Sequence, residues 1–174
     1  KLKTRFYQAS SSEMFGNSKL PCTEKMPFKP LSPYAISKLS AHQITVNYRN
    51  NYDIFAANGI LFNHESPLRG KDFVSKKIIE SLVLIKKGSK KALKIGNIYA
   101  KRDWGHAYDF VRGMHLILNH HKPDDFILTS EQNFSVKDMI NLVCKILEID
   151  GKWKGRGNNE YYEYNKRKIV IVDK

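Results

Sequence analysis

The sequence lacks the features of a membrane-spanning, secreted or disulfide-stabilised protein. No apolar run approaches the ~18 residues that a membrane helix needs; the longest uninterrupted runs, as at Leu82–Ile85, have four residues. The chain does not open on the pattern of a signal peptide. Only two cysteines are present, Cys22 and Cys144, and their distance in sequence does not indicate a disulfide framework. We therefore expect a soluble, cytoplasmic protein with no bound metal.

Acidic residues are scarce. Asp and Glu number 17 against 30 Lys and Arg, so the 174-residue chain carries a formal charge of +13. Ten basic and two acidic residues fall between Lys71 and Arg102. This excess is compatible with a nucleic-acid surface, with a pocket for a polyphosphate-bearing small molecule, or with a solvated helix face in a lysine-rich protein. No zinc spacing, homeodomain-like helix or aromatic RNA-binding signature accompanies the charge, so nucleic acid is the least favoured partner.

Segments with strand and helix patterns alternate along the chain, which is typical of an α/β fold with a mostly parallel sheet. The predicted strands are 5–10, 54–62, 92–95, 126–129 and 169–172. The predicted helices are 33–52, 73–87, 107–120 and 135–147. Ser32-Pro33 and Ser135 supply the helix-initiating residues. We expect loops at 21–33, at 63–70 and around 103–105, and a mobile loop at 151–164.

Tyr34 and Lys38 lie four residues apart in the first turns of a predicted helix, so they share one helix face. A free phenol is a weak base at neutral pH because its pKa is about 10. A neighbouring ammonium and the positive end of the helix favour the phenolate, which suits removal of a proton from a substrate hydroxyl. About twenty residues earlier, Ser11 and Glu13 follow a strand, at the edge where open α/β sheets bind ligands.

This set resembles the Ser/Thr, Tyr and Lys catalytic residues of the extended short-chain dehydrogenase/reductase family. A closer resemblance is to the GDP-mannose 4,6-dehydratases, and it runs from about Thr4 to Val172. It is carried by Phe6-Tyr7-Gln8-Ala9-Ser10, Ser12-Glu13, Ser32-Pro33-Tyr34-Ala35, Thr45-Val46-Asn47-Tyr48-Arg49, the run 58–67, Gly96-Asn97 and the run 102–107. The resemblance implies a partial Rossmann-like domain at 1–70, with the catalytic residues, and a mainly GDP-sugar-binding portion at 71–174 that returns in part to the sheet.

The resemblance implies an internal redox dehydration of GDP-mannose to GDP-4-keto-6-deoxymannose on NADP. Tyr34 would deprotonate the C4 hydroxyl of the mannose, and Lys38 would hold the nicotinamide ribose. Glu13 would remove the C5 proton and help water leave from C6. Ser11, where family members usually carry Thr, would donate a hydrogen bond to the C4 oxygen.

Further binding residues are implied by the same resemblance. Those near NADP are His64 and Arg69, together with Tyr34 and Lys38; those on the substrate side are Asn63, Val74, Lys77, Gly96 and Arg102. Val74 and Lys77 match a lid segment over the nucleotide, and the Arg102 guanidinium suits two oxygens of a diphosphate. Leu68 stands where the family resemblance leads us to expect Arg.

The family's Gly-x-x-Gly-x-x-Gly turn, which holds the cofactor diphosphate at a helix N-terminus, is absent, since no three of the ten glycines have that spacing. We therefore expect the C-terminal part of a dehydratase that binds NADP poorly by itself and turns over slowly or not at all. The resemblance also implies a homodimer or homotetramer. The alternatives are another nucleotide-sugar dehydratase or epimerase, an inactive remnant that serves as a binding partner, and a basic nucleic-acid-binding module. Glu13 favours dehydration over epimerisation.

Overall fold

The computed structural model describes residues 4–18 and 21–173, and this described part contains four α-helices and ten strands. It divides into two compact units. Unit 1 contains the residues up to Ser66 together with Asp103–Glu131, and unit 2 contains Pro67–Arg102 and the residues from Gln132 onwards. The functional portions expected at 1–70 and 71–174 stay a prediction. No helix in the described part is long and apolar enough to cross a membrane.

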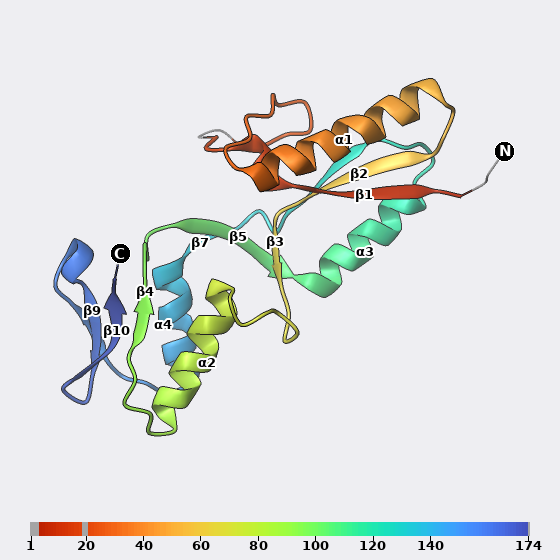
Figure 1. The fold of residues 1–174 in the computed structure, drawn as a ribbon. Helices are drawn as coiled ribbons and strands as arrows, with labels where there is room; N and C mark the ends of the chain where they lie inside the picture. The colour runs from red at the N-terminus through yellow and green to blue at the C-terminus, as the bar shows by residue number, and fades with distance from the viewer. Residues whose placement is uncertain (1–3, 19–20, 174) are drawn as a thin grey trace. The chain divides into compact units, whose positions relative to one another are not determined.

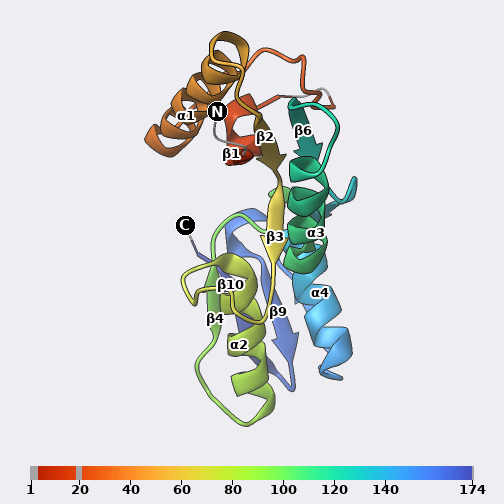
Figure 2. The same ribbon diagram turned by 90° about the vertical axis from the view of Figure 1, so that its right-hand side faces the viewer.

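Unit 1 is built on a three-stranded parallel sheet, which confirms the α/β class (Figure 1). Its strands, in spatial order, are β1 (Phe6–Ser11), β2 (Ala56–Leu61) and β6 (Asp125–Leu128). The helices α1 (Pro33–Asn51) and α3 (Ala107–Leu118) cover opposite faces of this sheet (Figures 1 and 2). β2 is the central strand, and one helix covers each of its faces. It is therefore buried over nearly its whole length, and its sequence is a near-continuous apolar run.

Two segments predicted as loops form strands instead. β3 (Asn63–Glu65) pairs in parallel with the end of β5 (Lys101–His106), with Asn63 opposite Trp104 and Glu65 opposite His106. The prediction of a loop over 63–70 is therefore wrong for its first three residues, and the loop expected around 103–105 is wrong as well. Each of these short strands is stabilised by backbone bonds to a segment far away in the sequence, which local patterns do not reveal.

Unit 2 contains a four-stranded sheet with two helices packed beside it (Figures 1 and 2). Its strands, in spatial order, are β4 (Leu93–Ile95), β10 (Arg167–Val172), β9 (Tyr161–Tyr164) and β8 (Lys152–Lys154). β4 and β10 are parallel, while the other two pairs are antiparallel. The expectation of a mobile loop over 151–164 is therefore wrong, because β8, the short 3-10 helix η2 (Gly157–Asn159) and β9 fill most of it.

The helices of unit 2 are α2 (Val74–Lys86) and α4 (Val136–Ile146), and they pack on one another. The short strand β7 (Asn133–Ser135) leads directly into α4. Ser135 and Asp138 form a reciprocal capping box at the start of α4, with bonds of 3.0 and 2.9 Å between side chain and backbone. The predicted boundaries of both helices agree with the structure to within a residue or two. For α4 the reason is that its capping contacts are local in sequence, whereas α2 has no side-chain cap and was recognisable from the helical spacing of its apolar residues.

Candidate active site

The carboxyl end of β1 presents a hydroxyl and a carboxylate. The buried Ser11 ends the strand, and its Oγ accepts a hydrogen bond from the Glu13 backbone N–H at 3.2 Å, which starts the 3-10 helix η1 (Ser12–Phe15). Because that oxygen acts as an acceptor, the Ser11 hydroxyl proton is still available for donation to a ligand. Met14 and Phe15 are 0% and 3% exposed and hold η1 in the core, while the side chain of Glu13 remains on the surface.

The start of α1 meets this turn. Ser32 caps the helix by accepting a bond from the Ala35 N–H at 3.1 Å, and its own hydroxyl donates to Glu13 Oε2 at 3.4 Å. Pro33 occupies the first helical position, where no N–H is needed. A single serine therefore both begins α1 and contacts the carboxylate of η1.

Tyr34 and Lys38 follow on the first turns of α1. The Lys38 Nζ donates to the Ala9 carbonyl of β1 at 3.0 Å and lies 5.7 Å from the centre of the Tyr34 ring. The Tyr34 side chain is 51% exposed, so its hydroxyl is accessible to a ligand. The structure thus gathers the four predicted catalytic residues, Ser11, Glu13, Tyr34 and Lys38, around the carboxyl end of β1 and the N-terminus of α1.

A buried polar network that the sequence analysis missed lies beneath this group. His42, one turn after Lys38 on α1, is 1% exposed; its Nδ1 lies 3.0 Å from Ser10 Oγ and its Nε2 lies 3.4 Å from Asp125 Oδ2. Asn58 Nδ2 donates to Asp125 Oδ1 at 2.8 Å. The network therefore connects α1 to all three strands of the sheet. The available signal was the position of His42 four residues after Lys38, which places both residues on one face of the helix.

Arg49, on the last turns of α1, completes the network. Both of its terminal nitrogens donate to Asp125 Oδ1 at 3.0 Å. Burial by itself raises the pKa of the Asp125 carboxyl, but the hydrogen bonds from His42, Asn58 and Arg49 outweigh burial and hold that pKa well below its usual range. Asp125 is therefore ionised at neutral pH and fixes the middle and the C-terminal turns of α1 on the sheet.

Asn63 and His64 also belong to unit 1, but they lie on β3 rather than on β1 or α1. The His64 ring stacks on Phe110 with 4.8 Å between ring centres, and its Nδ1 lies 2.9 Å from the Phe62 carbonyl oxygen. One ring nitrogen of His64 is thus used by the backbone, and the other is the atom that remains for a ligand.

The remaining predicted binding residues lie in unit 2. The Arg69 guanidinium lies 3.5 Å from the centre of the Phe73 ring, directly before α2. Val74 begins α2, and Lys77 is exposed in its first turn. Gly96 directly follows β4, and Arg102 is the second residue of β5; both are exposed. Leu68, where Arg was expected, is 94% exposed.

Asp103, next to Arg102 in the sequence, was also missed. It is 4% exposed, and its carboxylate accepts bonds from the Ser130 backbone N–H at 3.1 Å and from the Ser130 hydroxyl at 2.9 Å. The hydroxyl of Thr129 donates to the same carboxylate. Asp103 therefore ties β5 to the segment that follows β6. Its place within the Arg-Asp-Trp-Gly-His run was the available signal.

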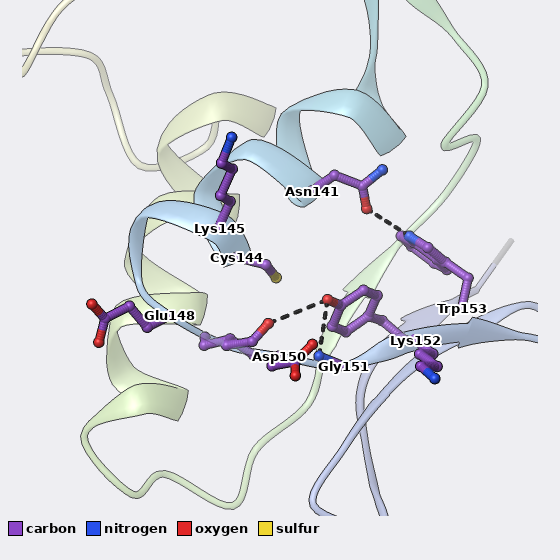
Figure 3. Close-up of a pocket in the computed structure, with 10 residues that line it drawn as sticks. Asn141, Cys144, Lys145, Glu148, Asp150, Gly151, Lys152 and Trp153 are labelled. Carbon is purple, nitrogen blue, oxygen red and sulfur yellow. Dashed lines mark hydrogen bonds between the residues drawn. The ribbon is translucent and has the colours of Figure 1, made fainter.

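Two pockets in the described part of the chain, one in each unit, are lined by other residues than the predicted site residues. A pocket of about 490 Å³ in unit 2 lies between the end of α4 and β8, and its lining includes Cys144, Trp153 and Tyr162 but none of the predicted site residues (Figure 3). The Tyr162 hydroxyl accepts a hydrogen bond from the Gly151 N–H at 3.2 Å and donates to the Ile149 carbonyl oxygen at 3.3 Å. A second pocket, of about 400 Å³ in unit 1, is lined by residues that follow Glu13.

Solved structures share this fold. A protein titled RMD from Pseudomonas aeruginosa, complexed with NADPH, matches with a TM-score of 0.79 and 24% identity, over 84% of this chain and 51% of that one. A dTDP-glucose 4,6-dehydratase from Bacillus anthracis, in complex with NAD, matches with a TM-score of 0.77 and 20% identity, over 98% and 50% of the two chains. The fold is thus Rossmann-like.

Sequence comparison narrows the class to one family. The profile described as GDP-mannose 4,6 dehydratase matches residues 1–174. GDP-mannose 4,6 dehydratase from Dictyostelium discoideum is 45% identical over 98% of this chain and 49% of its own length. GDP-mannose 4,6 dehydratase 1 from Arabidopsis thaliana is 51% identical over 94% of this chain and 43% of its own. The chain belongs to the GDP-mannose 4,6-dehydratase family, and it spans about half the length of these curated relatives.

Proposed function

We propose that this chain carries the proton-transfer residues and the GDP-sugar-binding residues of a GDP-mannose 4,6-dehydratase, a hydro-lyase that forms GDP-4-keto-6-deoxymannose. The observation that carries the proposal is the gathering of Ser11, Glu13, Tyr34 and Lys38 around the carboxyl end of β1. A hydroxyl donor, a carboxylate, a phenol and an ammonium are the groups that an internal oxidation and dehydration of a sugar requires. Membership of the family supports the same reaction.

Tyr34 is the proposed base for the C4 hydroxyl of the mannose. Its exposed phenol stands at the positive end of α1, with the Lys38 ammonium on the same helix face. Lys38 has three N–H donors and uses one on the Ala9 carbonyl, which leaves donors for a ribose hydroxyl. Ser11 donates to the C4 oxygen as that atom loses its proton.

Glu13 is the proposed base for the second half of the reaction. Once C4 is a ketone, the C5 proton is acidic, and the exposed Glu13 carboxylate can remove it. The same carboxyl group, now protonated, can deliver that proton to the departing C6 hydroxyl. The proton that Tyr34 took from the C4 hydroxyl is then available to replace the one lost from C5. The Ser32 hydroxyl, 3.4 Å from Glu13 Oε2, holds the carboxylate in orientation from the start of α1.

A nicotinamide cofactor, which we propose is NADP, supplies a hydride acceptor that returns the hydride at the end of the reaction. The residues present fit its nicotinamide ribose end, since Tyr34 and Lys38 lie together and accessible on α1. His64 and Arg69 are the further residues proposed to contact the cofactor. The 174 residues contain no Gly-x-x-Gly-x-x-Gly turn for its diphosphate.

The nucleotide sugar is proposed to bind Asn63 and the unit 2 residues Val74, Lys77, Gly96 and Arg102. The ten basic residues between Lys71 and Arg102 all belong to unit 2, and their charge favours a diphosphate over a neutral ligand. We further propose that the enzyme acts in the cytoplasm as a homodimer or homotetramer.

The test is to express the complete reading frame that contains these residues and to incubate the protein with NADP and GDP-mannose deuterated at C4. Mass spectrometry is expected to show loss of water with the deuterium retained, now at C6. Tyr34→Phe and Glu13→Gln are each expected to lower kcat by a factor of about 10² or more. Intact turnover in both variants would refute the assigned roles, and failure of the unsubstituted protein would refute the activity.

A second test uses the 174-residue chain by itself and measures which of the two ligands it binds. We expect it to bind GDP-mannose and to bind NADP weakly, with slow turnover or none. Titration calorimetry with each ligand measures the two affinities. Tight NADP binding or rapid dehydration by this chain would contradict the proposal that the cofactor cradle is not among these residues.

A further inference from the structure

The segment 96–102 of unit 2 has Gly96 and Arg102 at its ends, and its middle is held by the start of α4. The first two N–H groups of α4 donate to the carbonyl oxygens of Ala100 and Ile98, at 3.1 and 2.8 Å. N-terminal N–H groups have no partner within their own helix, so these bonds satisfy both the helix and the segment. The backbone of the segment is therefore attached to α4 at two points.

A buried carboxylate adds a third attachment. Glu160, between η2 and β9, is 4% exposed, which is rare for a glutamate. Its Oε2 accepts a hydrogen bond of 2.5 Å from the hydroxyl of Tyr99, in the middle of the segment. Its Oε1 accepts a bond from the ammonium of Lys137, in the first turn of α4. One carboxylate thus joins β9, α4 and the segment 96–102.

The charges of this cluster are matched. Burial by itself raises the pKa of the Glu160 carboxyl, but the bonds from Lys137 and Tyr99 lower it overall. The Lys137 ammonium also lies 4.7 Å from the centre of the Trp153 ring and 5.3 Å from that of Tyr99. Both rings present their faces to a cation, which stabilises the ionised pair.

The cluster of Glu160, Lys137 and Tyr99 acts on the position of the Tyr99 side chain. It is 56% exposed, so its ring contributes little to the apolar core of unit 2. Its hydroxyl nevertheless reaches a carboxylate that is almost completely buried. The main consequence of this bond is therefore to fix the position of Tyr99, and with it the segment between Gly96 and Arg102.

We propose that Glu160 is a positioning residue for nucleotide binding: through Tyr99 and Lys137 it sets the conformation in which Gly96 and Arg102 meet the guanosine diphosphate. Glu160 itself does not touch the ligand. A segment that is already ordered loses less conformational freedom on binding, so the attachment raises affinity. The inference rests on the proposed function, which assigns Gly96 and Arg102 to the nucleotide.

The test is titration calorimetry of GDP into the 174-residue chain and its variants. Tyr99→Phe removes only the hydroxyl and is expected to weaken GDP binding about fivefold, with a melting temperature near that of the unsubstituted chain. Glu160→Gln removes the charge that both partners face and is expected to weaken binding about tenfold or more.

The matched control is Glu163→Gln. Glu163 lies on β9, three residues after Glu160, and pairs with Lys154 at 2.6 Å, but its lysine is 51% exposed and the pair has no part in the segment 96–102. This variant is expected to bind GDP within about twofold of the unsubstituted chain, because exposed pairs contribute little. The control therefore shows whether the loss of any lysine–glutamate pair in unit 2 weakens GDP binding, or only the loss of the attachment of the segment 96–102.

Hydrogen exchange measures the segment without any ligand. In Glu160→Gln, the amides of residues 96–102 are expected to exchange faster than in the unsubstituted chain, while those of β9 and β10 change less. A merely structural role would lower protection throughout unit 2 and would lower the melting temperature in proportion to the affinity.

The outcomes separate the two proposals. If the folded, unsubstituted chain does not bind GDP, the proposed function fails and takes this inference with it. If it binds and both Tyr99→Phe and Glu160→Gln bind as tightly as Glu163→Gln, the inference alone is wrong. If Glu160→Gln unfolds, Tyr99→Phe decides: unchanged affinity overturns the inference, and weaker binding with an unchanged melting temperature supports it.

Discussion

Removal of the Asp125 carboxylate is predicted to cost unit 1 a large part of its stability. In Asp125→Ala, the guanidinium of Arg49 and the amide of Asn58 keep only their longer bonds, to the Ala56 and His42 carbonyls at 3.2 and 3.4 Å. His42 loses the carboxylate beside its Nε2. The side chains of Arg49 and His42 are only 12% and 2% exposed, so water cannot replace the lost partner fully. Breaking one member of a buried pair costs about 3–5 kcal/mol, and we expect about 4 kcal/mol here.

The assay is urea unfolding at pH 7. A Trp153→Phe background leaves Trp104, one of the two tryptophans and a residue of unit 1, as the fluorescent probe. With an m-value of about 2 kcal/mol/M, the loss corresponds to a midpoint lower by about 2 M. The matched control is Asp173→Ala in unit 2, followed by Trp153 in a Trp104→Phe background. Its partner Lys94 lies 3.0 Å away but is 70% exposed, and its cost is expected to stay below about 1 kcal/mol.

The pH dependence of the difference tests the same reasoning. The folded pKa of Asp125 is held below the unfolded value of about 3.9, so its contribution is fully present above pH 4 and is lost as pH falls toward the folded pKa. The gap between the unsubstituted chain and Asp125→Ala is therefore expected to be constant from about pH 5 to 8 and to shrink below pH 4. A cost no larger than that of Asp173→Ala, or a gap that grows on acidification, would refute the reasoning.

Three further predictions use single substitutions or labelling. Within the described residues, the Tyr7 hydroxyl is buried without a hydrogen-bond partner, and burial raises its pKa to about 12. Tyr7→Phe is therefore expected to leave the free energy of unfolding unchanged or to raise it by up to about 1 kcal/mol. A clear loss of stability in urea unfolding would contradict this. In Gly59→Ala, the added Cβ would lie 2.0 Å from that hydroxyl oxygen. The substitution is expected to lower the free energy of unfolding by about 2 kcal/mol in the same measurement. An unchanged free energy of unfolding would contradict the close approach. Cys144 is 1% exposed and burial raises the pKa of its thiol to about 11, so iodoacetamide at pH 8 is expected to modify Cys22 first, as followed by mass spectrometry; equal rates would show that the end of α4 opens readily.

The helices and the central strands were predictable from the sequence because their determinants are local. Ser32-Pro33 begins α1 and the Ser135 capping box begins α4 through bonds that span three residues. β2 is recognisable as a buried strand because both its faces are covered, so its residues are mostly apolar. Tyr34 and Lys38 could be placed on one face for the same reason, since the helical repeat alone decides it.

The short strands were not predictable in this way. β3, β5, β8 and β9 contain polar, aromatic and charged residues with no clear period. β3 and β5 pair with each other although they are distant in sequence, whereas β9 pairs with its neighbours in sequence, β8 and β10. The charged pairs of the core were missed for a related reason. Asp125 and Glu160 are ordinary acidic residues in the sequence, and nothing local to them indicates that Asp125 is half-buried or that Glu160 is buried.

By itself, the sequence determined the family, the α/β class, the helix boundaries and the four residues proposed for proton transfer, because motifs, caps and periodicity are properties of neighbouring residues. Only the tertiary structure decided which polar groups are enclosed: Asp125 beneath α1, Asp103 on β5 and Glu160 beside the segment 96–102. The physical reason is that the energy of a charge depends on what covers it and which donors face it, and in each case those groups come from other parts of the chain.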